Sequence, residues 1–263
     1  MSHFTVAILC DSPEQVEELL APYQENNMGD CPEKYMEFND KTEECENEYE
    51  GFYFKEKYPL FADFVKNYFG YKFNEAENAY GYWENPNAKW DWYVIGGRWM
   101  GSLLVKNDSD GVQGRPGTFG NEVPNTPKGY KWVDCCRISD VDFKKMEALR
   151  RYEMLKDEPI DGDLWEILST NNKPELRQKY TFYKSEWFIE RYGNKENYVN
   201  SESAFSTYAV ITPDGEWHSP GKMGWFGTSS EKVEDSQKFV DTYNEKFIEP
   251  YKDKIITIVD CHT

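Results

Sequence analysis

The sequence contains no run of about 18 consecutive apolar residues, which is the length that a membrane-spanning helix needs. Its opening residues, MSHFTVAILCDSPEQ, lack the basic segment of a signal peptide, and their apolar run is short. We therefore expect no membrane partner and a protein that stays in the cytoplasm where it is made. Histidine is scarce as well, with three residues, and no H-E-x-x-H or H-x-x-x-H spacing predicts a metal site.

Positive charge is also in short supply, since 30 lysines and arginines stand against 48 aspartates and glutamates, a net charge of −18. Neutralising phosphates requires a basic surface, so we expect no direct binding of nucleic acid. The sequence has no G-x-S-x-G nucleophile elbow, no dinucleotide-binding glycine pattern after a strand and no P-loop. No motif therefore identifies a reaction, and any cofactor stays unknown.

The cysteines form no C-x-x-C pair and no regular framework, and they are Cys10, Cys31, Cys45, Cys135, Cys136 and Cys261. In a cytosolic protein we expect them to be reduced. The vicinal pair Cys135–Cys136 has two interpretations. It is either two ordinary strand or loop cysteines, or a redox or metal-binding element.

The negative charge is concentrated near the N-terminus. Residues 11–50 carry a net charge of −12, whereas the positive and negative charges of residues 51–100 balance. One interpretation is a solvated, partly mobile acidic segment. The other is a surface that mimics a nucleic-acid backbone and docks onto a basic partner.

The first residues predict a strand followed by a helix. HFTVAIL (3–9) is a short β-branched run, and DSPEQVEELLAPY follows it. Ser12 is the expected N-cap, Pro13 suits the first helical position, and Gln15 completes a capping-box spacing. Residues 24–52 are polar and acidic, and we expect a loop or weakly ordered segment there.

Further elements complete the expected fold. We expect a helix over 58–70 that Gly70 ends, a hairpin over 205–219, an amphipathic helix from about Ser230, and a buried closing strand over 254–262. The closing strand is expected beside the first strand in the centre of the sheet. This order predicts an α+β protein with a ferredoxin-like (split βαβ) sheet core and a long, largely helical middle insertion. The expected parts are 1–137 (core, with the acidic segment 11–50), 138–200 (helical insertion) and 201–263 (the rest of the core).

Six of the nine tryptophans lie in two stretches where they alternate with glycine, NPNAKWDWYVIGGRWMG with the residues just before it and GEWHSPGKMGWFG. The Gly96–Gly97 pair predicts a bent strand, a bulge or a hairpin. Glycine allows close approach, and tryptophan offers a flat face with an N–H donor, which together suit a planar or sugar-like ligand. The candidate ligand-binding residues are Trp90, Asp91, Trp92, Arg98, Trp99, Trp217 and Trp225.

Each of these assignments has an alternative. The tryptophans could instead pack on one another as core around a bulge. The Arg98 guanidinium could clamp a phosphate or carboxylate, or it could pair with Asp91 or Glu84. GVQGRPGTFG (111–120) could be a flexible loop, or a phosphate-binding nest with Arg115.

The candidate catalytic residues are His218, Asp260 and His262. Asp260 and His262 are two residues apart on the closing strand and so share one face, which suits a general base oriented by a carboxylate. If the first and last strands pair, His3 lies near His262. A hydrogen-bonded structural role is the alternative for each histidine.

Four stretches of the sequence carry a resemblance to known proteins. MSHFTVAIL, YGYWENPNAKWDWYVIGGRW, PDGEWHSPGKMGWFG and TIVDCH resemble a family of proteins from tailed bacteriophages and prophages that has no established activity. The resemblance implies an accessory protein that acts in the cytoplasm of an infected bacterium. It implies no reaction and no catalytic residues.

Three functions remain open at this point. The α/β core could bind, or bind and degrade, a nucleotide-like or phosphorylated small molecule that serves host defence. The acidic segment could instead inhibit a host nucleic-acid-handling or defence protein by charge complementarity. The third is a structural or assembly role in the virion.

Overall fold

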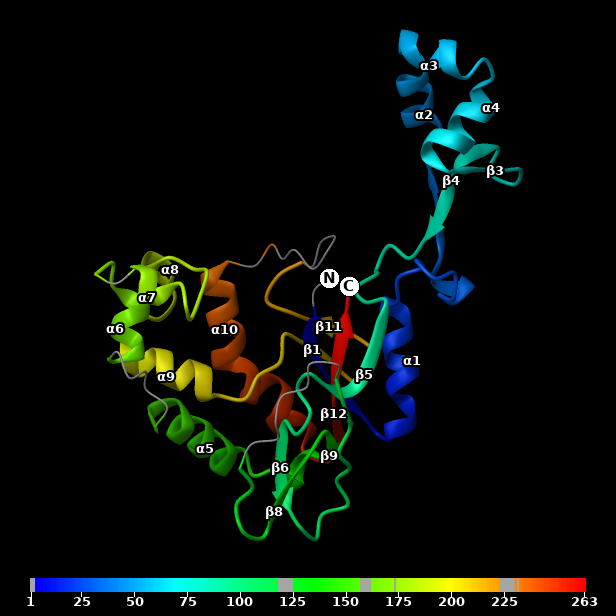
Figure 1. Ribbon diagram of the computed structural model, residues 1–263. Helices are drawn as coiled ribbons and strands as arrows, with labels where there is room; N and C mark the ends of the chain where they lie inside the picture. The colour runs from blue at the N-terminus through cyan, green and yellow to red at the C-terminus, as the bar shows by residue number, and fades with distance from the viewer. Residues whose placement is uncertain (1–2, 118–124, 157–161, 173, 223–229, 231) are drawn as a thin grey trace. The chain divides into compact units, whose positions relative to one another are not determined.

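The computed structural model describes residues 3–117, 125–156, 162–172, 174–222, 230 and 232–263, and it divides into two compact units (Figure 1). Unit 1 comprises Met1–Leu19 and Trp92–Thr263, and unit 2 comprises Leu20–Asp91. In the sequence, unit 2 is therefore an insertion between the two parts of unit 1. It contains residues 20–50, which are most of the acidic segment.

Unit 1 is built on a mixed sheet. Its strands are β1 (His3–Cys10), β5 (Trp92–Gly97), β7 (Arg115–Pro116), β9 (Cys135–Arg137), β10 (Ala209–Ile211), β11 (Trp217–His218) and β12 (Ile255–His262). The order is β11-β10-β1-β12-β5-β7, and β9 also pairs with β12. The closing strand β12 runs antiparallel to β1 along its whole length, with His3 opposite His262. Its predicted place beside the first strand in the centre of the sheet is confirmed.

The fold is α+β, as expected, but the ferredoxin-like topology is not confirmed. A split βαβ unit holds another strand between its two parallel strands. Here β1 and β10 are parallel and are direct neighbours, with Val6 opposite Ala209. The hairpin from β10 to β11 is present as predicted, and its second strand forms the edge of the sheet.

Most helices of unit 1 follow β9 and precede β10 in the sequence. They are α1 (Val16–Leu20), α5 (Phe143–Lys156), α6 (Leu164–Ser169), α7 (Pro174–Arg177), α8 (Ser185–Tyr192), α9 (Lys195–Ser203) and α10 (Val233–Tyr243). Shorter turns are η1 (Pro13–Gln15), η5 (Ile138–Asp140), η7 (Asn244–Ile248) and η8 (Glu249–Tyr251). Ser12 and Gln15 form the predicted capping box at η1. A separate pair of strands, β6 (Leu103–Lys106) and β8 (Tyr130–Val133), packs with α5.

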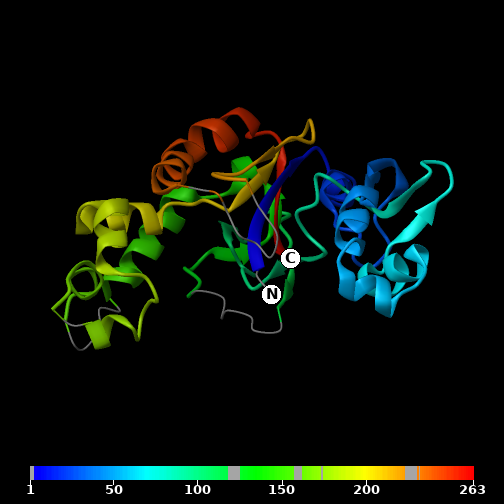
Figure 2. The same ribbon diagram turned by 90° about the horizontal axis from the view of Figure 1, so that it is seen from above.

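The main core lies between one face of the sheet and the helices that follow it in sequence. Ala7, Ile258 and Val210 from three neighbouring strands contact the same cluster as Tyr243 and Phe247. Figure 2 shows α10 lying along this face. Because side chains alternate along a strand, His3 of β1 and His262 of β12 project to this same face, at the end of the sheet.

Unit 2 is a small α+β unit with an aromatic core. Its elements are η2 (Ala21–Tyr23), η3 (Glu33–Tyr35), β2 (Glu37–Asp40), α2 (Thr42–Tyr49), α3 (Phe52–Lys57), α4 (Phe61–Phe64), η4 (Val65–Phe69), β3 (Lys72–Asn74) and β4 (Ala79–Glu84). The strand order is β2-β4-β3. Cys45, Phe64 and Val65 are fully buried among tyrosine and phenylalanine rings. Gly70 ends η4 in the left-handed conformation, as predicted.

The expectation of a loop or weakly ordered segment over 24–52 is wrong. These residues form η3, β2 and α2, and β2 pairs with β4. Cys45 supplies the buried position of α2, and its neighbours in the core come from residues 49–80. The acidic segment 11–50 is therefore divided between the two units.

No helix in the described part of the chain is both long and apolar enough to cross a membrane.

Candidate functional site

The Gly96–Gly97 pair at the end of β5 makes room for two buried carboxylates. Both glycines have a positive φ, +84° and +58°. A Cβ on Gly96 would lie 2.9 Å from Oδ2 of Asp134, and a Cβ on Gly97 would lie 2.3 Å from Cβ of Asp260. Any other residue would displace these side chains. The strand does not continue as a hairpin after the glycines, because β6 pairs with β8 instead of β5.

Asp134 is fully buried and holds the turns around this strand. Its carboxylate accepts backbone N–H groups from Gly101 (2.7 Å), Ser102 (3.1 Å) and Gly114 (2.8 Å). Desolvation raises the pKa of Asp134, and the three N–H donors oppose this effect. Its partners are all backbone groups, so Asp134 organises the loops. No motif in the sequence singled out this residue, although an aspartate within the buried run WVDCC is a signal for such a role.

The described part of the glycine-rich stretch, residues 111–117, packs against β5. Arg115–Pro116 pairs in parallel with Gly96–Gly97. A Cβ on Gly114 would lie 2.2 Å from the Ile95 carbonyl oxygen, so the glycine spacing serves close backbone approach. Residues 118–120 lie outside the described residues.

Asp260 also lies beneath the glycine pair, and it binds a histidine. Its side chain is 1% exposed, and its Oδ1 lies 2.8 Å from Nδ1 of His3. Its Oδ2 accepts the backbone N–H of Arg98 at 2.9 Å. The sequence predicted Asp260 as the partner of His262, and the structure corrects this pairing. Thr5 is the residue opposite Asp260, so the carboxylate reaches diagonally to the next position on β1.

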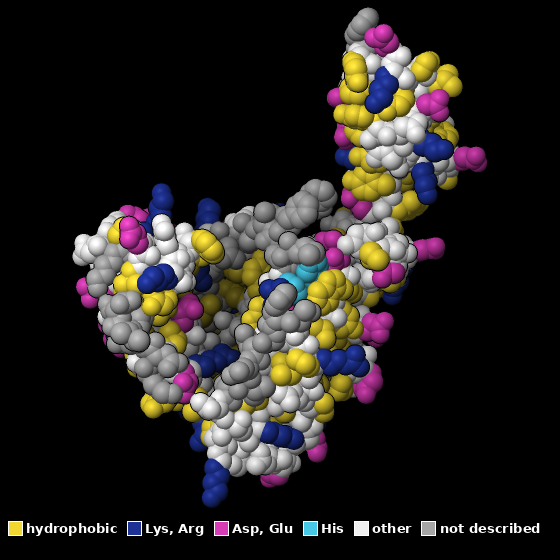
Figure 3. All heavy atoms as spheres, in the orientation of Figure 1, with side chains coloured by type: hydrophobic (Ala, Val, Ile, Leu, Met, Phe, Trp, Pro, Cys, Tyr) yellow, Lys and Arg dark blue, Asp and Glu magenta, His cyan; other side chains and the backbone are white. Residues whose placement is uncertain are grey.

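The aromatic side chains beside this pair form a shelf. The prediction that His3 lies near His262 is confirmed, since their rings are 5.0 Å apart. The Trp92 indole stacks on His262 (5.1 Å, 17°) and meets His3 edge-on (5.3 Å, 82°). Trp92 is 44% exposed, whereas His262 is buried. Figure 3 shows histidine side chains reaching the surface of unit 1 beside hydrophobic ones. We call His3, Trp92, Asp260 and His262 the histidine–tryptophan site.

The hydrogen bonds define what the site offers chemically. When Nδ1 of His3 donates to Asp260, Nε2 carries the lone pair of the neutral imidazole. Nε2 has no hydrogen-bond partner within the described residues. A carboxylate that holds one tautomer of an imidazole is the arrangement of a general base. The Arg98 side chain originates beside this pair, because its backbone N–H binds Asp260.

His218, a predicted member of the catalytic set, lies away from this site. It is on β11, three strands from β12, which at about 4.8 Å per strand is about 14 Å. Its ring contacts Phe247 (5.2 Å), and its Nε2 lies 3.1 Å from Thr212 Oγ1. The structure therefore does not bring His218 together with Asp260 and His262.

Trp92 and Trp217 are candidate ligand-binding residues from the two tryptophan-rich stretches, and the described residues do not bring them together. Trp217 contacts Phe4 (6.3 Å), which lies on the face of the sheet opposite to His3. Trp225 falls outside the described residues. Trp217 and Trp92 consequently cannot line one pocket.

The remaining candidates have local partners. Trp90 is buried in unit 2 and donates its indole N–H to the Leu20 carbonyl (3.0 Å). Asp91 accepts a hydrogen bond from Asn27 (3.2 Å), also in unit 2. The backbone N–H of Trp99 donates to the Gly96 carbonyl (3.1 Å), which closes the turn after β5.

The cysteines show no features of a nucleophile. All six are thiols, and burial raises the pKa of Cys10 to about 12. Burial likewise raises the pKa of Cys135 and of Cys136. Thiolates are the reactive species, so these side chains are unreactive at neutral pH. In the chain as described, no three histidine, cysteine or acidic side chains converge as they would around a metal ion.

Comparison with known proteins gives no relative: no protein-family model, no curated protein and no solved structure matches the chain.

Proposed function

We propose that the histidine–tryptophan site binds a planar, anionic small molecule of the nucleotide or phosphorylated class. The observation that carries the proposal is the exposed Trp92 indole stacked on His262, next to an imidazole that Asp260 orients. A flat indole supports stacking of a base, which contributes about 1–3 kcal/mol. The Arg98 side chain begins next to Asp260, because its backbone N–H binds the Asp260 carboxylate. Its guanidinium is suited to a phosphate.

The His3–Asp260 pair supports an additional hydrolytic step. In that step, Nε2 of His3 takes a proton from water as the water oxygen bonds to phosphorus, and the bond from phosphorus to the leaving oxygen breaks. The resemblance to phage proteins supports a role in the bacterial cytoplasm. Capturing or degrading a nucleotide signal there would counter host defence.

Calorimetric titration tests the binding. The panel consists of nucleoside mono-, di- and triphosphates, cyclic dinucleotides and the corresponding nucleosides. Trp92→Leu is expected to weaken binding by about 5- to 150-fold, the equivalent of about 1–3 kcal/mol. Arg98→Gln is expected to weaken binding of the phosphorylated ligands only.

Trp83→Leu is the matched control, because Trp83 in unit 2 is 49% exposed and lies on a strand too. It should leave binding unchanged. If no nucleotide binds, or if Trp92→Leu and Trp83→Leu bind alike, the proposal is wrong. Chromatography of the incubated ligand tests hydrolysis, which His3→Gln should abolish while binding persists.

A second candidate function has support in unit 2. This unit has 16 acidic and 7 basic side chains, a net charge of −9. It exposes many large hydrophobic side chains, namely Met28, Tyr53, Leu60, Tyr68, Phe73, Tyr82 and Trp83. Apolar groups within an acidic surface suit a basic protein partner. We infer an inhibitory docking role as the alternative.

Salt-dependent capture of host proteins tests this alternative. Glu43, Glu44, Glu46 and Glu48 are exposed on α2. Their combined replacement by glutamine should release a partner that the unmodified protein holds at low salt. If the variant retains every partner, the docking role is wrong.

A further inference from the structure

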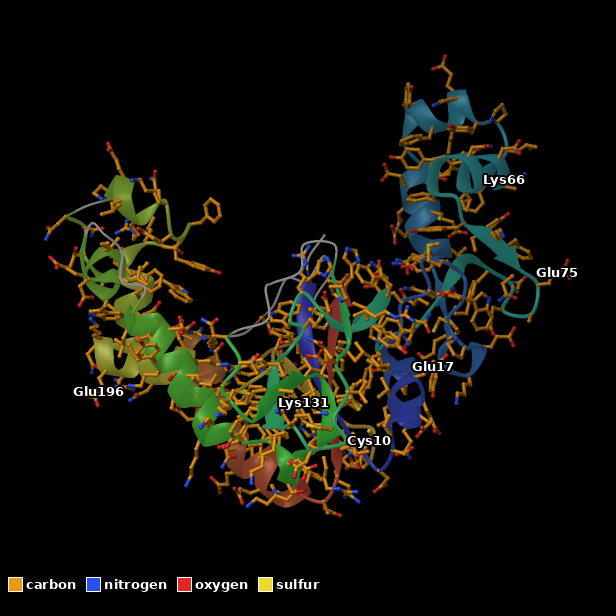
Figure 4. The ribbon with its side chains drawn as sticks, turned by 60° about the horizontal axis from the view of Figure 1, so that its bottom comes forward. Cys10, Glu17, Lys66, Glu75, Lys131 and Glu196 are labelled. Atoms are coloured by element: carbon orange, nitrogen blue, oxygen red, sulfur yellow. The ribbon has the colours of Figure 1, made fainter. Side chains whose placement is uncertain are left out.

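A cavity lies in the helical part of unit 1, apart from the histidine–tryptophan site. It has a volume of about 460 Å³, and its walls come from α5, α6, α9 and β8. Pockets for small molecules typically measure about 300–1,000 Å³. Figure 4 labels Lys131 on β8 and Glu196 on α9, which mark two of the contributing elements. We call it the α5–α9 cavity.

Arg150 of α5 lines this cavity without an acidic partner. Its guanidinium donates to the carbonyl oxygens of Ser102 (3.3 Å) and Ala204 (3.5 Å), and both bonds are long. No carboxylate in the described residues lies within ion-pairing distance of it. Desolvation lowers the pKa of Arg150, although Glu147 opposes this effect. A desolvated guanidinium with unused donors is a ready partner for a carboxylate.

Much of the remaining wall is apolar, although Asn125 and Tyr198 also line it. Trp132 of β8 is buried at the cavity, and its indole nitrogen has no hydrogen-bond partner within the described residues. Leu149 and Leu164 line the same space from α5 and α6. The body of a ligand here is therefore apolar.

Two carboxylates also line the cavity, and they restrict the ligand further. Glu202 of α9 accepts the Tyr192 hydroxyl (2.6 Å), and Glu153 lies one turn from Arg150 on α5. A simple anion would be attracted by one charge and repelled by two. A ligand with both a carboxylate and an ammonium group can pair with Arg150 and with Glu202 at the same time.

We propose that the α5–α9 cavity binds a zwitterionic amino acid with a large apolar side chain. The carboxylate pairs with Arg150, the ammonium group faces Glu202, and the side chain packs on Trp132. This site is independent of the proposed nucleotide site.

Calorimetric titration with four probes tests the proposal. The probes are phenylalanine, leucine, 3-phenylpropionate, which lacks the ammonium group, and phenethylamine, which lacks the carboxylate. Phenylalanine should bind at least tenfold more tightly than either single-charge analogue. Arg150→Gln should weaken the binding of phenylalanine at least tenfold. Glu202→Gln should reduce the difference in affinity between phenylalanine and 3-phenylpropionate.

Arg151→Gln is the matched control. Arg151 is the next residue of α5, its side chain bonds Asn200 of α9, and it does not line the cavity. It should bind phenylalanine as the unmodified protein does. Trp92→Leu should also leave this binding intact, so failure here is distinct from failure of the nucleotide site.

Several outcomes would overturn the proposal. These are no phenylalanine or leucine binding, equal binding of phenylalanine and 3-phenylpropionate, or equal losses in the two arginine variants. If Arg150→Gln does not fold, as circular dichroism would reveal, Glu202→Gln and the analogue series decide the matter alone.

Discussion

Replacing Gly97 by alanine would test whether the glycine pair seats the Asp260 carboxylate. The left-handed φ of +58° costs an alanine about 1–2 kcal/mol. The added Cβ would also lie 2.3 Å from Cβ and 2.4 Å from Oδ2 of Asp260, far inside van der Waals contact. Such overpacking costs about 1–3 kcal/mol. Moving Asp260 leaves His3 and the Arg98 N–H without an acceptor, at about 1–3 kcal/mol. Gly97→Ala should therefore lower the free energy of unfolding by about 3–8 kcal/mol in total.

Gly129→Ala separates the steric effect from backbone strain. Gly129 is also in unit 1 and has a φ of +85°, but nothing lies within 4 Å of the position that a Cβ would take. The free energy of unfolding of Gly129→Ala should fall by only about 1–2 kcal/mol. Each kcal/mol corresponds to about 2–4 °C in Tm for a chain of this size class. Urea and thermal unfolding of the two variants should therefore differ clearly, and equal losses would refute the packing of Gly97 on Asp260.

Two further predictions concern buried ionisable groups. Since desolvation raises the folded-state pKa of Asp134, its contribution to stability is largest below its ordinary pKa of 3.8 and is lost as pH rises through the folded-state value. The free energy of unfolding of the unmodified protein minus that of Asp134→Asn should thus fall with rising pH, and a rise would contradict it. Because Cys10, Cys31, Cys45, Cys136 and Cys261 are buried, Ellman's reagent at pH 8 should label none of these five within minutes, whereas all six thiols, including the half-buried Cys135, should react in guanidinium. Fast labelling of the native protein would contradict the burial of Cys10.

Sequence patterns correctly predicted the elements that can be recognised from their own residues. The capping box at Ser12, the turn of the 205–219 hairpin and the apolar closing strand were all readable. Unit 2 was not, because α2 has one fully buried residue, Cys45, and its core partners come from later residues. Composition alone made this region look like a solvated loop. The split βαβ topology is not confirmed, and the reason is related: the order of the elements in the sequence does not determine whether β1 and β10 are neighbours.

The candidate site was predictable only as far as strand pairing could be guessed. Pairing the first and last strands correctly placed His3 beside His262. It could not reveal that Asp260 reaches the diagonal histidine, because that depends on register and side-chain direction. His218 required the full strand order, since it shares the face of the site yet lies three strands away.

Two buried aspartates lie beside the Gly96–Gly97 turn, and their hydrogen-bond partners indicate different roles. Asp134 accepts three backbone N–H groups with its carboxyl oxygens, so these oxygens hold the loops. Asp260 binds the Arg98 N–H with one oxygen and, with the other, a side chain that can itself change protonation. The turn at Gly96–Gly97 contacts both carboxylates, so it fixes the position of Asp260 relative to β5. The orientation of His3 therefore depends, through Asp260, on the backbone turn at Gly96–Gly97, and this explains why two glycines stand between tryptophans here.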